Sequence, residues 1–182
     1  MNYRKSVLLL AAISLTAMPL GARDDGHKGP EHDFRAELRG RNELPLTLSG
    51  ARGTLSLSVS DDDKFVHFVL EYAGLLMPTT AAHIHVAQPG ANGGVTVFFC
   101  GTVPAGFPPR LPCPLNGTVE GDFTAADVIG LTSQQLEANN LAKLLAAIRA
   151  GTTYANVHTS TSPAGEIRGQ IRDDEKDKKD KD

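Results

Sequence analysis

The stretch RGTLSLSVSDDDKFVHFVLEYAG, residues 52–74, decides the fold class. In its first half Leu55, Leu57 and Val59 alternate with small polar residues, a pattern typical of a β-strand with one buried face. The polar segment DDDK at 61–64 then turns the chain, and the denser apolar run after it predicts a second strand. The stretch therefore predicts a pair of strands joined by a short turn.

Further short strands follow along the chain. The same alternation appears in five later segments: AHIHVAQ (82–88), GGVTVFFC (93–100), NGTVEGDFT (116–124), TYANVHT (153–159) and GEIRGQIR (165–172). Turn residues separate most of them, such as PGANGG and SPAG. Several short strands joined by turns favour an all-β domain, an antiparallel sandwich or barrel.

One segment, LTSQQLEANNLAKLLAAIRAG at 131–151, has a different period. Its apolar residues fall at i, i+3, i+4 and i+7, which is one face of an α-helix: Leu141, Leu144, Leu145 and Ile148. We predict one crossover helix near residues 139–150, with its leucine face closing an open end of the β core. Thr132 with Gln135 resembles a capping box, and Gly151 suits the position after the last turn.

The first 22 residues have the pattern of a secretory signal peptide. Arg4 and Lys5 precede an apolar run at 6–17, and small residues lead to a predicted cleavage after Ala22. The run is shorter than the roughly 20 residues that span a bilayer, so we expect no retained transmembrane anchor. The protein is therefore predicted to be secreted, either to the periplasm or to the exterior.

The remaining chain divides into one domain and two polar ends. We predict a flexible segment at 23–32, a single domain at 33–172 and a disordered charged tail at 173–182, because neither end can bury apolar surface. The formal net charge of −3, without a basic stripe, argues against a nucleic-acid partner.

The two cysteines of the chain, Cys100 and Cys113, flank a proline-rich loop. An oxidising compartment would allow a disulfide between them. The alternative, free thiols that bind a metal or act as a redox pair, fits less well because the spacing is not that of a CxxC motif.

Three histidines share one side of the predicted sheet. Successive side chains of a strand point to opposite faces, so His83 and His85 share one face and Ile84 points to the other. The same alternation places His158 on one face of its strand with the polar residues. If the apolar residues face the core, all three histidines stand on the outer face, where loops could cover them. Three imidazoles are a ligand set for copper or zinc, and His67 is a fourth candidate ligand.

A structural role is the alternative for each of these histidines. His83 would then hydrogen-bond the PGANGG turn, and His158 the SPAG hairpin. His27 and His32, in the flexible segment, are expected to be bystanders. Glu166 and Arg168 share a face of the last strand and are expected to pair there or with a neighbouring strand.

Catalytic residues are not predicted. The acidic residues cluster in turns and in the tail, where they cannot hold a general acid and base in register. Ser160 and Ser162 lie near His158, but neither has the G-x-S-x-G context of a nucleophile.

Two long stretches resemble a known family. AAHIHVAQPGANGGVTVFFC (81–100) and TYANVHTSTSPAGEIRGQI (153–171) are similar to the CHRD (chordin) domain, which also occurs in short secreted microbial proteins. The resemblance covers about residues 33–172. It implies an all-β domain, immunoglobulin-like or superoxide-dismutase-like, and leaves the biochemical role open.

A second resemblance concerns AHIHVAQPGANGG at 82–94, which is similar to the G-x-H-x-H strand and following loop of copper/zinc superoxide dismutases. It implies His83 and His85 as metal ligands, with His158 as a third. The loop from Cys100 to Pro114 has no counterpart of the dismutase zinc-loop histidines.

The sequence thus predicts a secreted, disulfide-containing CHRD-domain protein that acts as a non-catalytic binding or structural module toward an unknown protein or surface partner. A copper or zinc site at His83, His85 and His158 is part of this hypothesis. The alternative is a mononuclear copper protein with redox or dismutase-like activity.

Overall fold

The structure is a computed structural model that describes residues 33–174. Its strands are β1 (Asp33–Arg39), β2 (Arg52–Val59), β3 (Phe65–Ala73), β4 (Thr79–Val86), β5 (Gly94–Gly101), β6 (Gly117–Thr124), β7 (Thr153–Thr159), β8 (Ile167–Gln170) and β9 (Arg172–Asp173). Its helices are α1 (Leu141–Arg149) and the 3-10 turns η1 (Gly40–Asn42), η2 (Ala125–Asp127) and η3 (Thr132–Gln134). The predicted segments 1–22 and 23–32, and residues 175–182 of the predicted tail 173–182, lie outside the described residues. Asp173, at the start of that predicted tail, belongs to β9.

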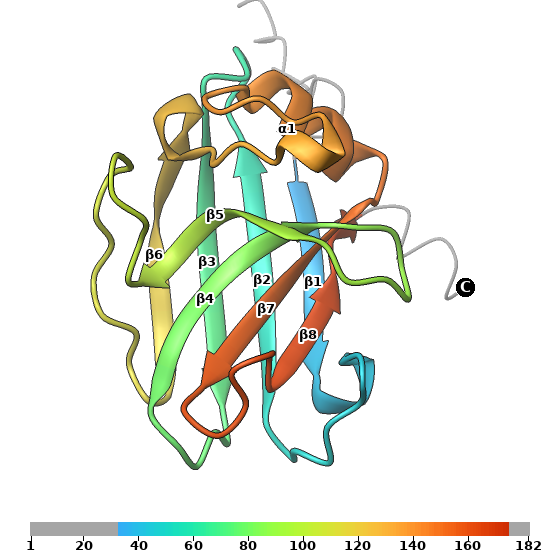
Figure 1. Cartoon of the computed structure of the whole chain (residues 1–182), viewed down its shortest axis with the longest axis vertical. Helices are drawn as coiled ribbons and strands as arrows, with labels where there is room; N and C mark the ends of the chain where they lie inside the picture. Colours follow the sequence, from blue (N-terminus) through green and yellow to red (C-terminus); the bar gives the residue numbers. More distant parts are fainter. Residues whose placement is uncertain (1–32, 175–182) are drawn as a thin grey trace, which may run out of the picture.

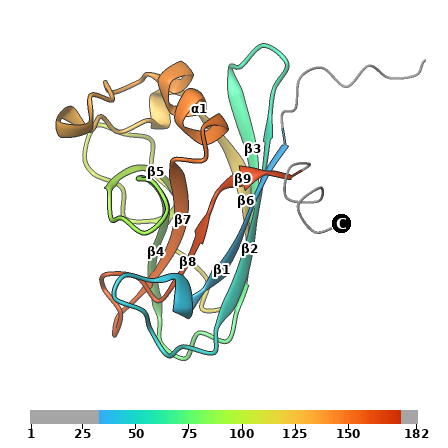
Figure 2. The ribbon, with the colours of Figure 1, turned by 90° about the vertical axis from the view of Figure 1, so that its right-hand side faces the viewer.

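All strands belong to one sheet, and all of its pairings are antiparallel. The order is β5-β4-β7-β8-β1-β2-β3-β6, with β9 paired to β1. The sheet folds back on itself, so that β4, β5, β7 and β8 face β1, β2, β3 and β6 across the interior (Figure 1, Figure 2). The prediction of an all-β antiparallel fold is confirmed, in the form of a nearly closed barrel.

Aromatic rings join the two layers through the interior. Phe68 of β3 lies 4.7 Å from Phe99 of β5 and 6.4 Å from Phe123 of β6, measured between ring centroids. All three side chains are buried. Their contacts hold the two ends of the sheet together where no strand pairing does so.

The first strand, β1, was not among the predicted strands. Phe34, Ala36 and Leu38 are buried in it while their neighbours are more exposed. The alternation that predicted β2 is therefore present in β1 as well, but it extends over only three apolar positions.

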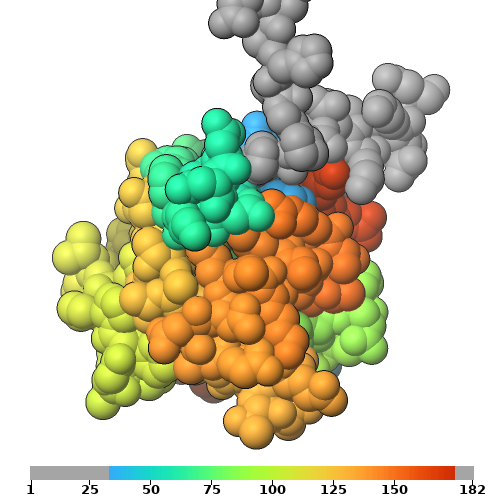
Figure 3. All heavy atoms as spheres, turned by 90° about the horizontal axis from the view of Figure 1, so that it is seen from above, coloured from blue at the N-terminus to red at the C-terminus, as the bar shows by residue number. Residues whose placement is uncertain are grey.

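Helix α1 covers one end of the barrel, as predicted (Figure 3). Its four apolar residues, predicted to face the core, are all buried. Gly151 follows the last turn with a positive φ of 67°, the conformation that glycine adopts at lowest cost. The predicted capping box is displaced, because Thr132 opens η3 and Asn140 caps α1 by accepting a hydrogen bond from the Lys143 amide.

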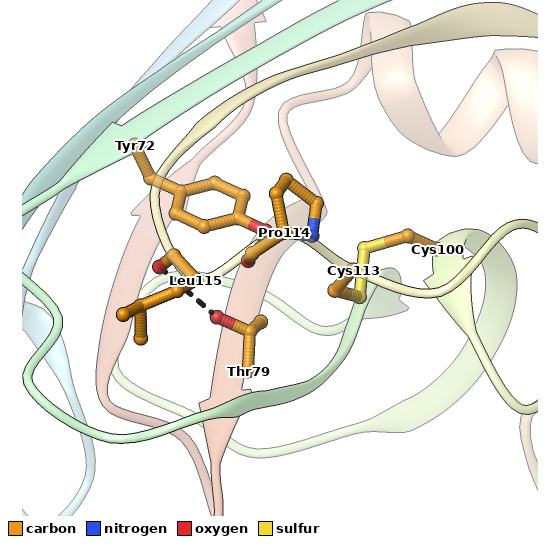
Figure 4. The surroundings of a disulfide bond; sticks show 6 residues. All are labelled: Tyr72, Thr79, Cys100, Cys113, Pro114 and Leu115. Carbon is orange, nitrogen blue, oxygen red and sulfur yellow. Dashed lines mark hydrogen bonds between the residues drawn. A yellow bond between two sulfur atoms is a disulfide. The ribbon is translucent and has the colours of Figure 1, made fainter.

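A disulfide closes the seam between the two edge strands. Cys100 at the end of β5 is bonded to Cys113, in the segment that leads into β6. The residues after Cys113 are held by both layers: the Tyr72 hydroxyl of β3 donates to the Pro114 carbonyl at 2.8 Å, and the Thr79 hydroxyl of β4 donates to the Leu115 carbonyl (Figure 4). The predicted disulfide is therefore present, and it joins strands that do not pair in the described residues.

Replacing both cysteines with alanine is expected to lower the free energy of unfolding by about 3 kcal/mol, the entropic effect of opening a short covalent loop. Urea denaturation of the variant and of the parent protein measures this difference. Reduction of the parent protein should give a similar loss. Equal denaturation midpoints for oxidised and reduced protein would show that the bond does not stabilise the barrel.

No helix in the part of the chain from residue 33 to residue 174 is long and apolar enough to cross a membrane.

Candidate metal centre

The pairing of β4 with β7 brings three histidines together. In this register His83 lies opposite Asn156 and His85 opposite Tyr154, while His158 pairs with Ala81, two positions further along. The three histidines therefore occupy adjacent positions on one face. One ring nitrogen from each of them falls within 4.8 Å of the other two.

The hydrogen bonds of two of these rings fix which nitrogen faces the centre. Nδ1 of His85 donates to the Gly93 carbonyl at 2.9 Å, and Nδ1 of His158 donates to the Pro163 carbonyl at 3.1 Å. A ring with its proton on Nδ1 keeps a free lone pair on Nε2. Backbone carbonyls hold metal-ligating histidines in this way in many proteins, where they set the tautomer and the ring orientation.

The other nitrogens converge. Nδ1 of His83 donates a hydrogen bond to Nε2 of His85 at 3.0 Å, because the proton of His85 is on Nδ1. Nε2 of His158 is buried and has no hydrogen-bond partner, which is costly for a polar atom. The three histidines could hold a metal ion, with Nε2 of His85 and His158 and Nδ1 of His83 as the ligand atoms once the His83 proton moves to its Nε2.

Burial keeps the three rings neutral. It lowers the pKa of His83 to about 2, assisted by the neighbouring rings of His158 and His85. It lowers the pKa of His85 to about 4, with smaller contributions from His158 and Arg168, against the opposing effect of the hydrogen bond to Gly93. The pKa of His158 is lowered for the same main reason. A neutral imidazole is the form that binds a metal.

Loops cover the histidine face, as the sequence analysis anticipated. The three histidines are only 6 to 8% exposed. Phe98 of β5 packs edge-on against His83, with 4.8 Å between ring centroids. The segments that carry Gly93 and Pro163 come from the PGANGG turn and the SPAG hairpin and supply the carbonyl partners.

Tyr154 and Arg168 form a stacked column with His85. The Tyr154 ring lies parallel to the His85 ring at 4.5 Å, and the guanidinium of Arg168 lies 3.4 Å from the centroid of the Tyr154 ring. Arg168 also donates to the Ala91 carbonyl at 2.6 Å and to Asn92 Oδ1 at 3.0 Å. This column therefore fastens the PGANGG turn over the site.

The sequence predicts a ladder pair or an inter-strand hydrogen bond for Glu166 and Arg168. The two side chains do not pair with each other, but the Glu166 carboxylate accepts an inter-strand hydrogen bond from Thr159 of β7 and a second one from Ser49. Arg168 donates to the PGANGG turn instead, and strand parity does not give the position of that turn.

His67 lies apart from this centre. It sits on β3, in the opposite layer, and its ring nitrogens contact Asp122 at 2.9 Å and Glu120 at 3.5 Å. Its side chain is 42% exposed. The structure therefore does not bring this fourth candidate to the other three histidines.

One buried acid of this region was not predicted. Glu43, just after η1, is 5% exposed, and burial raises its pKa to about 7 against the lowering effects of Arg168 and Asn156. Its Oε1 atom and Oδ1 of Asn156 have no hydrogen-bond partner. The surrounding sequence, NELPL, carries no periodicity that would have indicated a buried carboxyl.

Comparison with known proteins agrees with the family expectation. The model of the CHRD domain matches residues 34–171, nearly the whole of the described chain. This chain belongs to the CHRD domain family. No curated protein and no solved structure matches it. All three histidines of this CHRD domain lie within the two stretches that resemble the family, 81–100 and 153–171.

Proposed function

We propose that this CHRD-domain protein is a secreted, non-catalytic binding module with a metal ion, copper or zinc, held by His83, His85 and His158. The observation that carries the proposal is the buried convergence of three neutral imidazole nitrogens, two of them oriented by backbone carbonyls. The ion would satisfy the unpartnered Nε2 of His158. Secretion is supported by the signal-peptide pattern of residues 1–22 and by the disulfide, a bond typical of oxidising compartments.

A redox or dismutase-like role is less well supported. Such chemistry needs a coordination position that a substrate can reach. The three rings are nearly inaccessible, and Phe98, Tyr154 and two loop segments pack around them. This enclosure favours an ion that holds β4, β7 and their loops in one arrangement, with the module's outer surface free to bind a partner.

The test is metal content followed by titration. Mass spectrometry of protein exported from its native host should find about one metal ion per chain. Titration of the metal-free protein with Cu(II), Cu(I) and Zn(II) should show one site. His158→Ala should weaken binding more than about 100-fold, because loss of an outer-shell partner alone costs about 10- to 100-fold.

His67→Ala is the matched control, since this histidine lies outside the cluster and should leave the affinity unchanged. All variants should carry alanine at positions 27 and 32, so that the histidines of the N-terminal segment do not compete. If His158→Ala binds metal as tightly as the parent protein but unfolds more easily, the three histidines are structural and the metal hypothesis is wrong.

A further inference from the structure

We propose that the three-histidine site selects the singly charged cuprous ion, Cu(I), over the divalent ions Cu(II) and Zn(II). This inference rests on the proposed function, because it names the ion that the same site prefers. It follows from the charges in and around the site, from its burial and from the number of ligands.

The ligands bring no negative charge. The cluster consists of His83, His85 and His158, and no carboxylate or thiolate joins it among residues 33–174. A bound ion therefore keeps its full charge in a buried site under the loops. Because the cost of burying a charge rises with the square of that charge, a divalent ion is disfavoured far more than a monovalent one.

A permanent cation stands beside the site. Arg168 is 3% exposed, and its guanidinium, which remains protonated in proteins, is separated from the His85 ring by the Tyr154 ring alone. Its positive charge is felt at His85, where it contributes to the lowered pKa. The same charge repels a divalent ion twice as strongly as a monovalent one.

Two carboxyl groups, those of Glu166 and Glu43, lie on the same side of the molecule and could offset the repulsion between Arg168 and a bound ion. Both oxygens of Glu166 already accept hydrogen bonds, from Ser49 and Thr159. Burial raises the pKa of Glu43 to about 7, so this group is largely protonated in mildly acidic solution. The charge of Arg168 acts on Glu43, whose pKa it lowers. It also acts on His85, whose pKa it lowers, so its positive charge reaches the site.

The ligand number points the same way. The described chain offers three nitrogens, and Zn(II) in protein sites is almost always bound by four ligands. Cu(II) prefers a tetragonal set of nitrogen and oxygen ligands. Cu(I) is stable with three nitrogens and needs no added water, which suits a site enclosed by Phe98 and Tyr154.

The experiment compares affinities for Cu(I), Cu(II) and Zn(II) in the full mature chain. Cu(I) is measured without oxygen, by competition with a chromogenic cuprous chelator, and the divalent ions by competition with chelators of known affinity. Two variants are matched: Arg168→Gln removes the charge, whereas Arg168→Lys keeps it, and both lose the two hydrogen bonds that the guanidinium donates. The quantity compared is the ratio of Cu(I) to Zn(II) affinity, because a loss of packing that weakens the binding of both ions equally leaves this ratio unchanged.

The parent protein should bind Cu(I) more tightly than either divalent ion. The affinity ratio should fall about tenfold in Arg168→Gln, as expected for loss of a unit charge roughly 10 Å from an ion at an effective dielectric constant of about 20. Arg168→Lys should keep most of the ratio. If the parent protein binds Zn(II) or Cu(II) as tightly as Cu(I), this inference is wrong, although the proposed metal site stands. The inference is also wrong if the ratio of Cu(I) to Zn(II) affinity is the same in Arg168→Gln and Arg168→Lys. A protein that binds none of the three ions overturns the proposed function as well.

Discussion

Lowering the pH from 6.5 to 4.5 is expected to reduce the free energy of unfolding of the metal-free protein by about 2 kcal/mol, and that of its Glu43→Gln variant by about 4 kcal/mol. The histidine centre produces the loss, and Glu43 offsets part of it. Urea denaturation at a series of pH values, with a chelator present, measures both quantities.

The histidines act through the unfolded state. Burial lowers the pKa of His83 to about 2 and that of His85 to about 4, whereas both rings titrate near 6.5 when the chain is unfolded. As the pH falls below 6.5 the unfolded chain binds protons that the folded protein does not, at a cost of about 1.4 kcal/mol per pH unit for each ring. The contribution of His85 ends near pH 4 and that of His83 near pH 2. His158 acts in the same direction.

Glu43 acts with the opposite sign. Its pKa is about 7 in the folded protein and near 4.5 in the unfolded chain, so the folded protein binds its proton first as the pH falls. Its contribution to stability is present below pH 4.5 and is lost as the pH rises through 7. Glutamine cannot titrate, so the variant exposes the full effect of the histidines. Parallel pH profiles for the two proteins would contradict the assignment of Glu43.

Phe68→Ala is expected to lower the free energy of unfolding by about 3 to 5 kcal/mol, the range for removing a buried aromatic side chain. Phe68 is 1% exposed and contacts both Phe99 and Phe123. Its loss leaves a cavity between the layers next to the seam that the disulfide closes. Denaturation in urea at pH 7 measures the change.

Phe65→Ala is the matched control on the same strand, since this phenylalanine is 44% exposed. Its effect should be smaller than about 1 kcal/mol. Phe68→Ala should retain metal binding under conditions in which it is folded, because its ring lies in the interior and the histidines lie on the outer face of β4 and β7. Similar losses from both substitutions would show that the interior is less tightly packed than the aromatic contacts indicate.

Much of the candidate site could be predicted because it depends on local parity. The two-residue alternation placed His83 with His85, and His158 on the same kind of face in its own strand, and the pairing of β4 with β7 then brought them together. The same rule could not place His67, since parity gives the face of a strand but not the layer to which the strand belongs. The layer depends on pairings between residues far apart in the chain.

The supporting residues were harder to predict. The sequence predicts a ladder pair or an inter-strand hydrogen bond for Arg168 and Glu166, but the partners of Arg168 lie on the PGANGG turn and on Tyr154. Glu43 is buried by loops whose course no periodic pattern specifies. The bounds of the helix were predicted within two residues because its leucine face is periodic. Its N-cap is Asn140 rather than the predicted Thr132, because a capping signal is short and recurs by chance.

The place of β1 between β8 and β2 has a consequence for the biogenesis of the protein. β1, the first described strand, pairs with β8, one of the last, in the middle of the sheet. β4 likewise pairs with β7, which is synthesised much later. A growing chain therefore cannot complete the barrel until β7 and β8 have left the ribosome, on the order of seconds after β1. A long interval without the closed fold would suit the export that we propose for this protein, since an unfolded polypeptide can thread through a translocation channel.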